Sequence, residues 1–205
     1  MKKTFFSALF TGLMMISLMA AGPGPGYKPG DKAIDFNLKN IDGQMMSLKS
    51  MESAKGFIVV FTCNHCPFSV KYEDRIIALD KKYKSMGYPV VAINPNDKTK
   101  EPDDSFDKMV VRAKEKGFSF PYLYDESQAI ASAYGASRTP HVYVLRKAGS
   151  DLVVEYIGAI DDNANDAVSA KNKYVEQAVD ELLAGKKVSM GFTKAIGCTI
   201  KWKDA

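Results

Sequence analysis

Two cysteines separated by two residues form the first chemically active pattern in this sequence. The motif Cys63-Asn64-His65-Cys66 stands between an apolar run at 57–61 and a segment with helical spacing. Such a pair can alternate between a dithiol and a disulfide, and the amides and dipole at a helix start stabilise a thiolate. If the helix includes both cysteines, their spacing places them on adjacent corners of one turn. We therefore predict thiol–disulfide exchange, with Cys63 as the nucleophile of low pKa.

In this scheme Cys66 is the resolving thiol, which displaces whatever Cys63 has captured. His65 lies between the two cysteines and is expected to tune the Cys63 thiolate through positive charge or a hydrogen bond. Two other interpretations of the pair are weaker. A zinc site needs two further ligands, which only the two histidines or Cys198 could supply. A structural disulfide across so short a loop gives little entropic benefit. We predict no metal ion and no cofactor.

The dipeptide Thr139-Pro140 precedes a predicted strand and is the second candidate site feature. Its position in the order of elements favours a cis peptide bond, a conformation that is uncommon for such bonds in general. A cis proline turns the preceding backbone outward, so an extended peptide can pair with Thr139 by strand addition. The expected partners are protein dithiols or disulfides bound as extended peptides, and a protein that donates or accepts electrons. His141 follows directly, and alternation along the strand leaves open whether it faces the site or the core.

The rest of the chain alternates strand and helix patterns that could position these residues. Strands are predicted at 57–61, 88–93, 121–124, 141–146 and 152–157, and a hairpin over 35–48 around Asp42-Gly43. Helices are predicted at 68–86, 105–116, 126–134 and 174–183, each ending near a glycine, with Asp104 as the cap of the second. This order predicts an α/β fold in which a mixed sheet carries helices on both faces.

The beginning of the chain resembles a secretory signal peptide. Lys2 and Lys3 precede an apolar stretch that ends in small residues near Ala21. We predict a signal peptide at 1–21, a flexible Gly/Pro segment at 22–30, one domain at 31–185 and a C-terminal tail at 186–205 that packs on it. An uncleaved membrane anchor is the alternative, because the apolar stretch approaches spanning length. Export, to the periplasm in a bacterium, implies an oxidising or mixed redox compartment.

The charge pattern argues against a nucleic-acid partner. The 205 residues carry a formal charge of +4, which falls to +2 without Lys2 and Lys3. The lysines are scattered along amphipathic segments and do not form a basic patch beside stacking aromatic residues. Apart from the leader, no segment is expected to contact a membrane.

Several motifs together resemble the thioredoxin-like superfamily, and most closely its peroxiredoxin-like branch of redoxin, AhpC/TSA-type proteins, here with a CxxC motif. The resemblance covers roughly 28–185. The motifs that carry it are Asp35-Phe36 with Leu38, Asp42-Gly43, Phe61-Thr62-Cys63-Asn64-His65-Cys66-Pro67, Asn94-Pro95-Asn96-Asp97, Arg138-Thr139-Pro140 and Gly197-Cys198-Thr199-Ile200-Lys201-Trp202. It implies a three-layer thioredoxin-like fold with an N-terminal β-hairpin extension and a segment inserted after the second strand.

Departures from the family pattern bear on two alternative functions. A thiol peroxidase centred on Cys66 would, by that resemblance, carry proline seven residues earlier and Thr or Ser three residues earlier. Val59 and Cys63 stand at those positions, so efficient peroxide reduction is not expected. A metal-handling module similar to copper chaperones of this fold would use Cys63, Cys66 and His141.

Four further features of the sequence concern the site and the tail. Glu73 follows Cys66 by seven residues on the same helix face and could handle protons, although a solvated acid is the favoured interpretation. Cys198 could be a third redox thiol, pair between molecules or stay buried and inert, and burial is slightly favoured. Trp202 suggests that the tail packs on the domain. His65 resembles the residue of the oxidising periplasmic disulfide donor, whereas the hairpin resembles reductases, so both directions of electron flow stay open.

Overall fold

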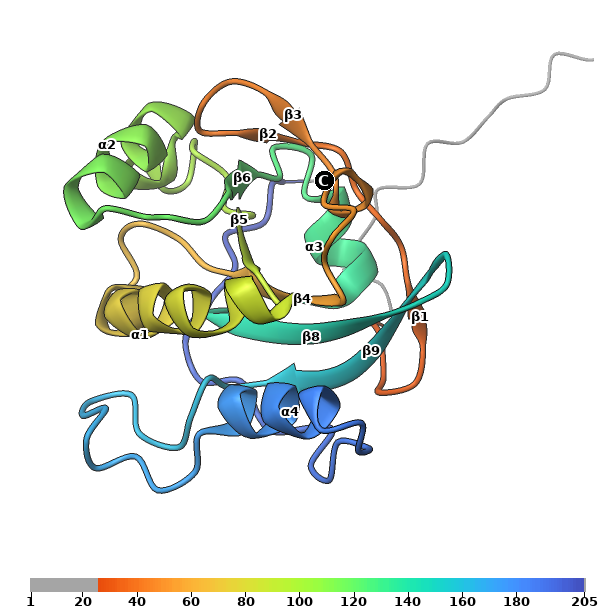
Figure 1. Ribbon diagram of the computed structural model, residues 1–205. Helices are drawn as coiled ribbons and strands as arrows, with labels where there is room; N and C mark the ends of the chain where they lie inside the picture. Colours follow the sequence, from red (N-terminus) through yellow and green to blue (C-terminus); the bar gives the residue numbers. More distant parts are fainter. Residues whose placement is uncertain (1–25, 205) are drawn as a thin grey trace, which may run out of the picture.

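The structure is a computed structural model that describes residues 26–204 (Figure 1). The predicted signal peptide lies outside the described residues. The strands are β1 (Lys32–Ala33), β2 (Leu38–Asn40), β3 (Met45–Met46), β4 (Gly56–Phe61), β5 (Val90–Asn94), β6 (Tyr122–Tyr124), β7 (Arg138–Thr139), β8 (His141–Ala148), β9 (Asp151–Gly158) and β10 (Cys198–Thr199). The α-helices are α1 (Pro67–Tyr83), α2 (Phe106–Lys116), α3 (Ala129–Tyr134) and α4 (Tyr174–Leu183), with 3₁₀ turns at Leu48–Ser50, Lys84–Met86 and Pro102–Asp104.

Eight of these strands form one mixed sheet in the order β1-β9-β8-β4-β5-β6-β2-β3. At its centre β4 runs parallel to β5 and antiparallel to β8, and every residue of β4 is buried. A strand covered on both faces is apolar throughout, which explains the uninterrupted run of large apolar residues at 57–61. The predicted α/β fold with a mixed sheet is confirmed.

Alternate residues of the central strands face two separate hydrophobic layers. On one face, Ile58 and Val60 pack with residues of α1, α2 and α4. On the other, Phe57 and Phe61 pack with α3, the N-terminal segment and the C-terminal tail. Figure 1 shows α1 and α4 on one side of the sheet and α3 on the other. The predicted cover of helices on both faces is therefore present.

The predicted hairpin forms an extension of the sheet. β2 and β3 pair antiparallel around Asp42-Gly43, and Gly43 has a positive φ of 85°, which a residue without a Cβ adopts at little cost. β2 also pairs with β6, so the hairpin continues the sheet at that edge. Three two-residue strands, β1, β7 and β10, were not predicted, because two residues are too few to show alternation.

Glu73 is not a solvated acid, so that interpretation is wrong. Its side chain is buried on α1 and accepts hydrogen bonds from the Arg112 guanidinium at 2.7 and 2.8 Å, with the Lys116 ammonium 3.4 Å away. A buried carboxylate requires such partners. The pair joins α1 to α2 and thereby fixes the helix that follows the two cysteines. Within residues 26–204 no helix is long and apolar enough to cross a bilayer.

Candidate active site

The two cysteines lie in the turn between β4 and α1. β4 ends at Phe61 and α1 begins at Pro67, so Cys66 is the N-cap residue and Cys63 precedes the helix. Proline is well accommodated in the first turn, where the amide has no intrahelical acceptor. Both cysteines therefore meet the positive end of α1, but the predicted placement of both on one helical turn is wrong.

Cys66 is joined by a disulfide to Cys198, a residue 132 positions later in the tail. The Cα atoms of the two residues are 6.2 Å apart, within the normal range for a disulfide. Cys63 is the free thiol and is buried. The favoured prediction that Cys198 is an inert thiol is wrong. The site contains three cysteines, with Cys66 bonded to the one that is distant in sequence.

The free thiol of Cys63 is surrounded by weak hydrogen-bonding groups. Its Sγ atom lies 3.4 Å from Thr139 Oγ1, 3.8 Å from Ser69 Oγ and 3.9 Å from His65 Nδ1. Burial, and next the negative charge of Asp104, raise the pKa of Cys63 to about 11. In this disulfide-bonded form the prediction of a low pKa at Cys63 is wrong: desolvation outweighs the helix start, and the thiol keeps its proton at neutral pH.

Asp104 organises the cysteine turn and was missed as a site residue. It is fully buried at the end of the 3₁₀ turn Pro102–Asp104, while Ser105 occupies the N-cap position of α2 that we had assigned to Asp104. Its carboxylate accepts hydrogen bonds from the backbone amides of Asn64 at 2.7 Å and His65 at 3.3 Å. It also contacts Asn96 Nδ2 at 2.6 Å and His65 Nδ1 at 2.6 Å. A signal was present in the Asn94–Asp97 motif, because Asn96 donates to this carboxylate and Asn94 Nδ2 donates to the backbone carbonyl of Asp104 at 2.8 Å.

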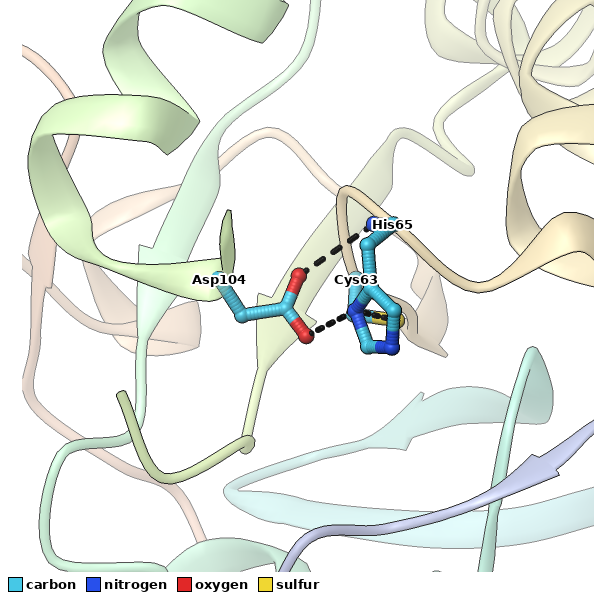
Figure 2. Close-up of side chains that lie close together, drawn as sticks. All are labelled: Cys63, His65 and Asp104. Carbon is cyan, nitrogen blue, oxygen red and sulfur yellow. Dashed lines mark hydrogen bonds and ion pairs between the residues drawn. The ribbon is translucent and has the colours of Figure 1, made fainter. Parts of the chain in front are cut away.

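His65 lies between the buried carboxylate and the free thiol. Figure 2 shows its ring bridging Asp104 and Cys63. The opposite ring atom, Nε2, is 3.1 Å from a carboxylate oxygen of Glu101. A carboxylate oxygen therefore faces each of the two ring nitrogens. The arrangement Asp104–His65–Cys63 thus places a proton-carrying group beside the thiol.

The Thr139–Pro140 peptide bond is cis, as predicted. The Thr139 side chain contacts Cys63 through Oγ1, and its carbonyl oxygen lies 3.3 Å from Cys66 Sγ. The same dipeptide therefore contacts both members of the motif. The edge of β7 is already occupied, because β10 pairs antiparallel with it and brings Cys198 opposite Thr139.

Comparisons with known proteins agree with this geometry. The sequence profile of the AhpC/TSA family matches residues 29–154, more than half of the chain. The chain belongs to the AhpC/TSA family. It is 27% identical over 127 residues to "Thiol-disulfide oxidoreductase ResA" from Halalkalibacterium halodurans, which covers 62% of this chain and 68% of the relative. The predicted oxidoreductase class is confirmed.

Two solved structures have folds similar to that of this chain. An uncharacterized conserved protein from Geobacillus kaustophilus has 36% identity and a TM-score of 0.81, covering 91% of this chain and 98% of its own. A putative thiol:disulfide interchange protein DsbE from Chlorobium tepidum has 20% identity and a TM-score of 0.57, covering 76% and 98%. At that identity the second likeness concerns the fold alone. This member of the AhpC/TSA family thus has the predicted thioredoxin-like fold.

His141 faces the core side of its strand. It is 7% exposed, its Nδ1 accepts a hydrogen bond from the Ser137 amide at 3.3 Å, and its ring centre is 4.9 Å from that of Tyr143. Within residues 26–204, the metal-ligating atoms that come together, within 4.8 Å of one another, belong to Cys63, His65 and Asp104. His141 does not join this group, and Cys66 offers no free thiolate in the disulfide. The copper site expected from Cys63, Cys66 and His141 is therefore not assembled in this form.

Burial of His141 predicts an acid-sensitive fold. Burial lowers the pKa of His141 to about 4, whereas the unfolded chain binds the proton near 6.5. The stability linked to neutral His141 is present above pH 6.5 and is lost as the pH falls towards 4, by about 3 kcal/mol in total. Urea unfolding at pH 7, 5.5 and 4 should show this slope in the wild type and a shallower one in His141→Gln. An unchanged slope in the variant would contradict the assignment.

Proposed function

We propose that this thiol–disulfide oxidoreductase exchanges disulfides with protein partners through Cys63 and Cys66, with Cys198 as a third exchanging sulfur. The observation that carries the proposal is the meeting of a free thiol and a disulfide at one residue, Thr139, before a cis proline. A buried thiol and a disulfide whose Cys66 is also buried, both in contact with Thr139, support transfer of the bond from one cysteine to another.

The first step is an internal exchange. The Cys63 thiolate attacks Cys66 Sγ, a Cys63–Cys66 disulfide forms, and the Cys66–Cys198 bond breaks. Cys198 leaves as a thiolate and takes up the proton that Cys63 gave away, so the step needs no external oxidant or reductant. A partner dithiol can then reduce the Cys63–Cys66 disulfide, or a partner disulfide can be attacked by Cys63 once the pair is reduced.

His65 and Asp104 support the proton transfer in this proposal. Cys63 has to lose its proton although burial and Asp104 raise its pKa to about 11. The His65 ring lies 3.9 Å from the thiol and is held by Asp104, so an imidazole there can take the proton and then stabilise the thiolate as a cation. Thr139 and Ser69 offer further hydrogen bonds to the sulfur.

Single cysteine variants test the proposal in an insulin-reduction assay with dithiothreitol. Cys66→Ser should abolish the enhancement, because Cys66 takes part in both disulfides. Cys63→Ser should lower it by at least about 100-fold, given the typical range for loss of a nucleophile. Cys198→Ser should retain exchange through the motif pair. Full activity in Cys63→Ser would contradict the proposal.

A peroxide assay on the same variants distinguishes disulfide exchange from the alternative function, thiol peroxidase activity. The Cys66–Cys198 disulfide is also the product that a peroxide-oxidised Cys66 would leave after resolution by Cys198. Under the exchange proposal, hydrogen peroxide is consumed no faster by the wild type than by Cys66→Ser. Peroxide consumption that survives Cys63→Ser and is lost in Cys66→Ser would favour a thiol peroxidase instead.

We further propose that the chain is exported to an oxidising compartment, the periplasm in a bacterium. The basic and apolar sequence before residue 22 supports this, as does a disulfide between residues far apart in the chain. Intact-mass measurement of the protein recovered from a periplasmic fraction should show the loss of residues 1–20 or 1–21. Recovery of the full-length protein in the cytosol alone would contradict it.

A further inference from the structure

The C-terminal tail lies on β7 in the position that a bound peptide strand would take. Cys198 pairs with Thr139 and Thr199 pairs with Arg138 in an antiparallel register. The backbone amide of Ile200 continues this contact to the Ser137 carbonyl at 3.4 Å. Main-chain pairing along a strand edge is one mode by which proteins bind extended peptides, and here it lies beside a reactive cysteine.

Beyond β10, hydrogen bonds to main-chain groups hold the tail on the domain. They do not involve the side chains of the tail. The Lys201 carbonyl accepts hydrogen bonds from the Asp97 amide at 2.9 Å and Gln128 Nε2 at 2.8 Å, and the Lys201 amide donates to Asn96 Oδ1 at 2.9 Å. The Lys203 amide donates to Gln128 Oε1 at 2.7 Å. Because these partners recognise main-chain groups, another extended chain could make the same bonds.

At two positions of the tail, the size of the side chain determines whether the tail fits on the domain. A Cβ atom at Gly197 would come within 2.2 Å of the Thr139 carbonyl oxygen, a distance at which the rigid backbone would have to shift. At the other end Ile200 is 3% exposed and packs in the layer that contains Phe36, Leu48 and Ala136. Glycine just before the cysteine and a large apolar residue two positions after it are thus both accommodated.

We infer that the tail is a tethered copy of the partner strand, and that this protein prefers extended peptides with glycine directly before the reactive cysteine and a large apolar residue two positions after it. The inference rests on the proposed function. A partner strand can reach Cys66 only after the tail leaves β7. Attack of Cys63 on Cys66 releases Cys198 and removes the covalent link, so that only the main-chain hydrogen bonds and Ile200 still hold the tail on that edge.

The tail itself provides the first test. Gly197→Ala should weaken the docking of β10 and shift the single disulfide of the full-length chain from Cys66–Cys198 towards Cys63–Cys66. The ratio of the two linkages, measured by peptide mapping after acid quenching, should change by at least about tenfold, as overpacking against backbone implies. Gly191→Ala is the matched control, because its Cβ would meet only the Pro29 side chain at 3.1 Å and the Glu155 carbonyl at 3.4 Å. An unchanged ratio in Gly197→Ala, or an equal shift in both variants, would overturn the inference.

Free peptides test the substrate preference directly. The full-length Cys63→Ser, Cys198→Ser double variant keeps Cys66 as its reactive sulfur. It is mixed with a peptide of the sequence of residues 196–202, its cysteine activated as a pyridyl disulfide, and with the same peptide carrying alanine for glycine. The first should form the mixed disulfide at least about tenfold faster, for the same steric reason. Equal rates, or no reaction with either peptide, would overturn the inference.

The insulin assay separates failure of this inference from failure of the proposed function. Wild-type insulin reduction together with equal rates for the two peptides would remove the glycine preference and leave the exchange function standing. Absence of insulin reduction together with equal peptide rates would remove both.

Discussion

Replacing Asp104 with alanine is expected to make Cys63 more reactive and the fold less stable. The negative charge of Asp104 is the second cause, after burial, of the raised pKa of Cys63. Without it the pKa should fall below about 11, and each unit of that fall increases the thiolate fraction at neutral pH about tenfold. The rate of Cys63 alkylation by iodoacetamide, followed from pH 7 to 11, measures the change.

The stability cost of the same variant comes from the donors that Asp104 leaves behind. The part-buried amides of Asn64 and His65 and the buried amide group of Asn96 would lose their acceptor. Unsatisfied buried donors cost about 1–3 kcal/mol each, so a loss of about 3 kcal/mol or more is expected in urea unfolding. Asp103→Ala is the matched control, because the exposed Asp103 contacts Asn64 through its backbone carbonyl only. An Asp104→Ala variant that alkylates at the wild-type rate would show that this charge does not govern Cys63.

Reduction of the Cys66–Cys198 disulfide is expected to produce the largest change in stability. The bond closes a loop across a sequence separation of 132 residues. For a loop of that length the chain-entropy argument gives an upper bound of about 5 kcal/mol. The loss should be smaller than this bound, because the hydrogen bonds of Lys201 and the burial of Ile200 can hold the reduced tail. A fall in Tm on the order of 10 °C is expected in dithiothreitol.

Cys63→Ser provides the control for this measurement. Cys63 is the free thiol, so its replacement should leave the Tm difference between oxidised and reduced protein unchanged. Cys198→Ser should instead show the reduced Tm with or without dithiothreitol. Hydrogen exchange adds a local readout, since the amides of Ile200 and Lys201 should lose protection when the tail is released. A Tm that does not respond to dithiothreitol would show that the covalent link adds nothing to the fold.

These two predictions describe opposing demands on one site. Cys66 is held in the disulfide to the tail, and Cys63 beside it is buried, which keeps its thiol protonated. An exchange enzyme needs the same sulfur to ionise and to reach a partner. Release of the tail would expose the β7 edge, so tail docking and thiol reactivity should change together.

The sequence by itself determined most of the architecture and the identity of the motif pair. Periodicity marked β4 and α1, because a central strand is apolar throughout and a helix repeats its apolar face every three to four residues. The same patterns located the cis Thr139–Pro140 bond between α3 and β8. These features depend on contacts between near neighbours in the chain, and so they can be recognised from local residue type and spacing.

Only the tertiary structure decided which sulfurs are bonded and what surrounds the free thiol. Cys66 pairs with a residue 132 positions away and not with Cys63 three positions before it, and no local pattern encodes that choice. Asp104 and Glu73 had the residue types of a helix cap and a surface acid, yet both are buried with partners from distant segments. The pKa of Cys63 also depends on residues that are distant in the sequence. Desolvation and a remote charge set it, and both exist only once the chain has folded.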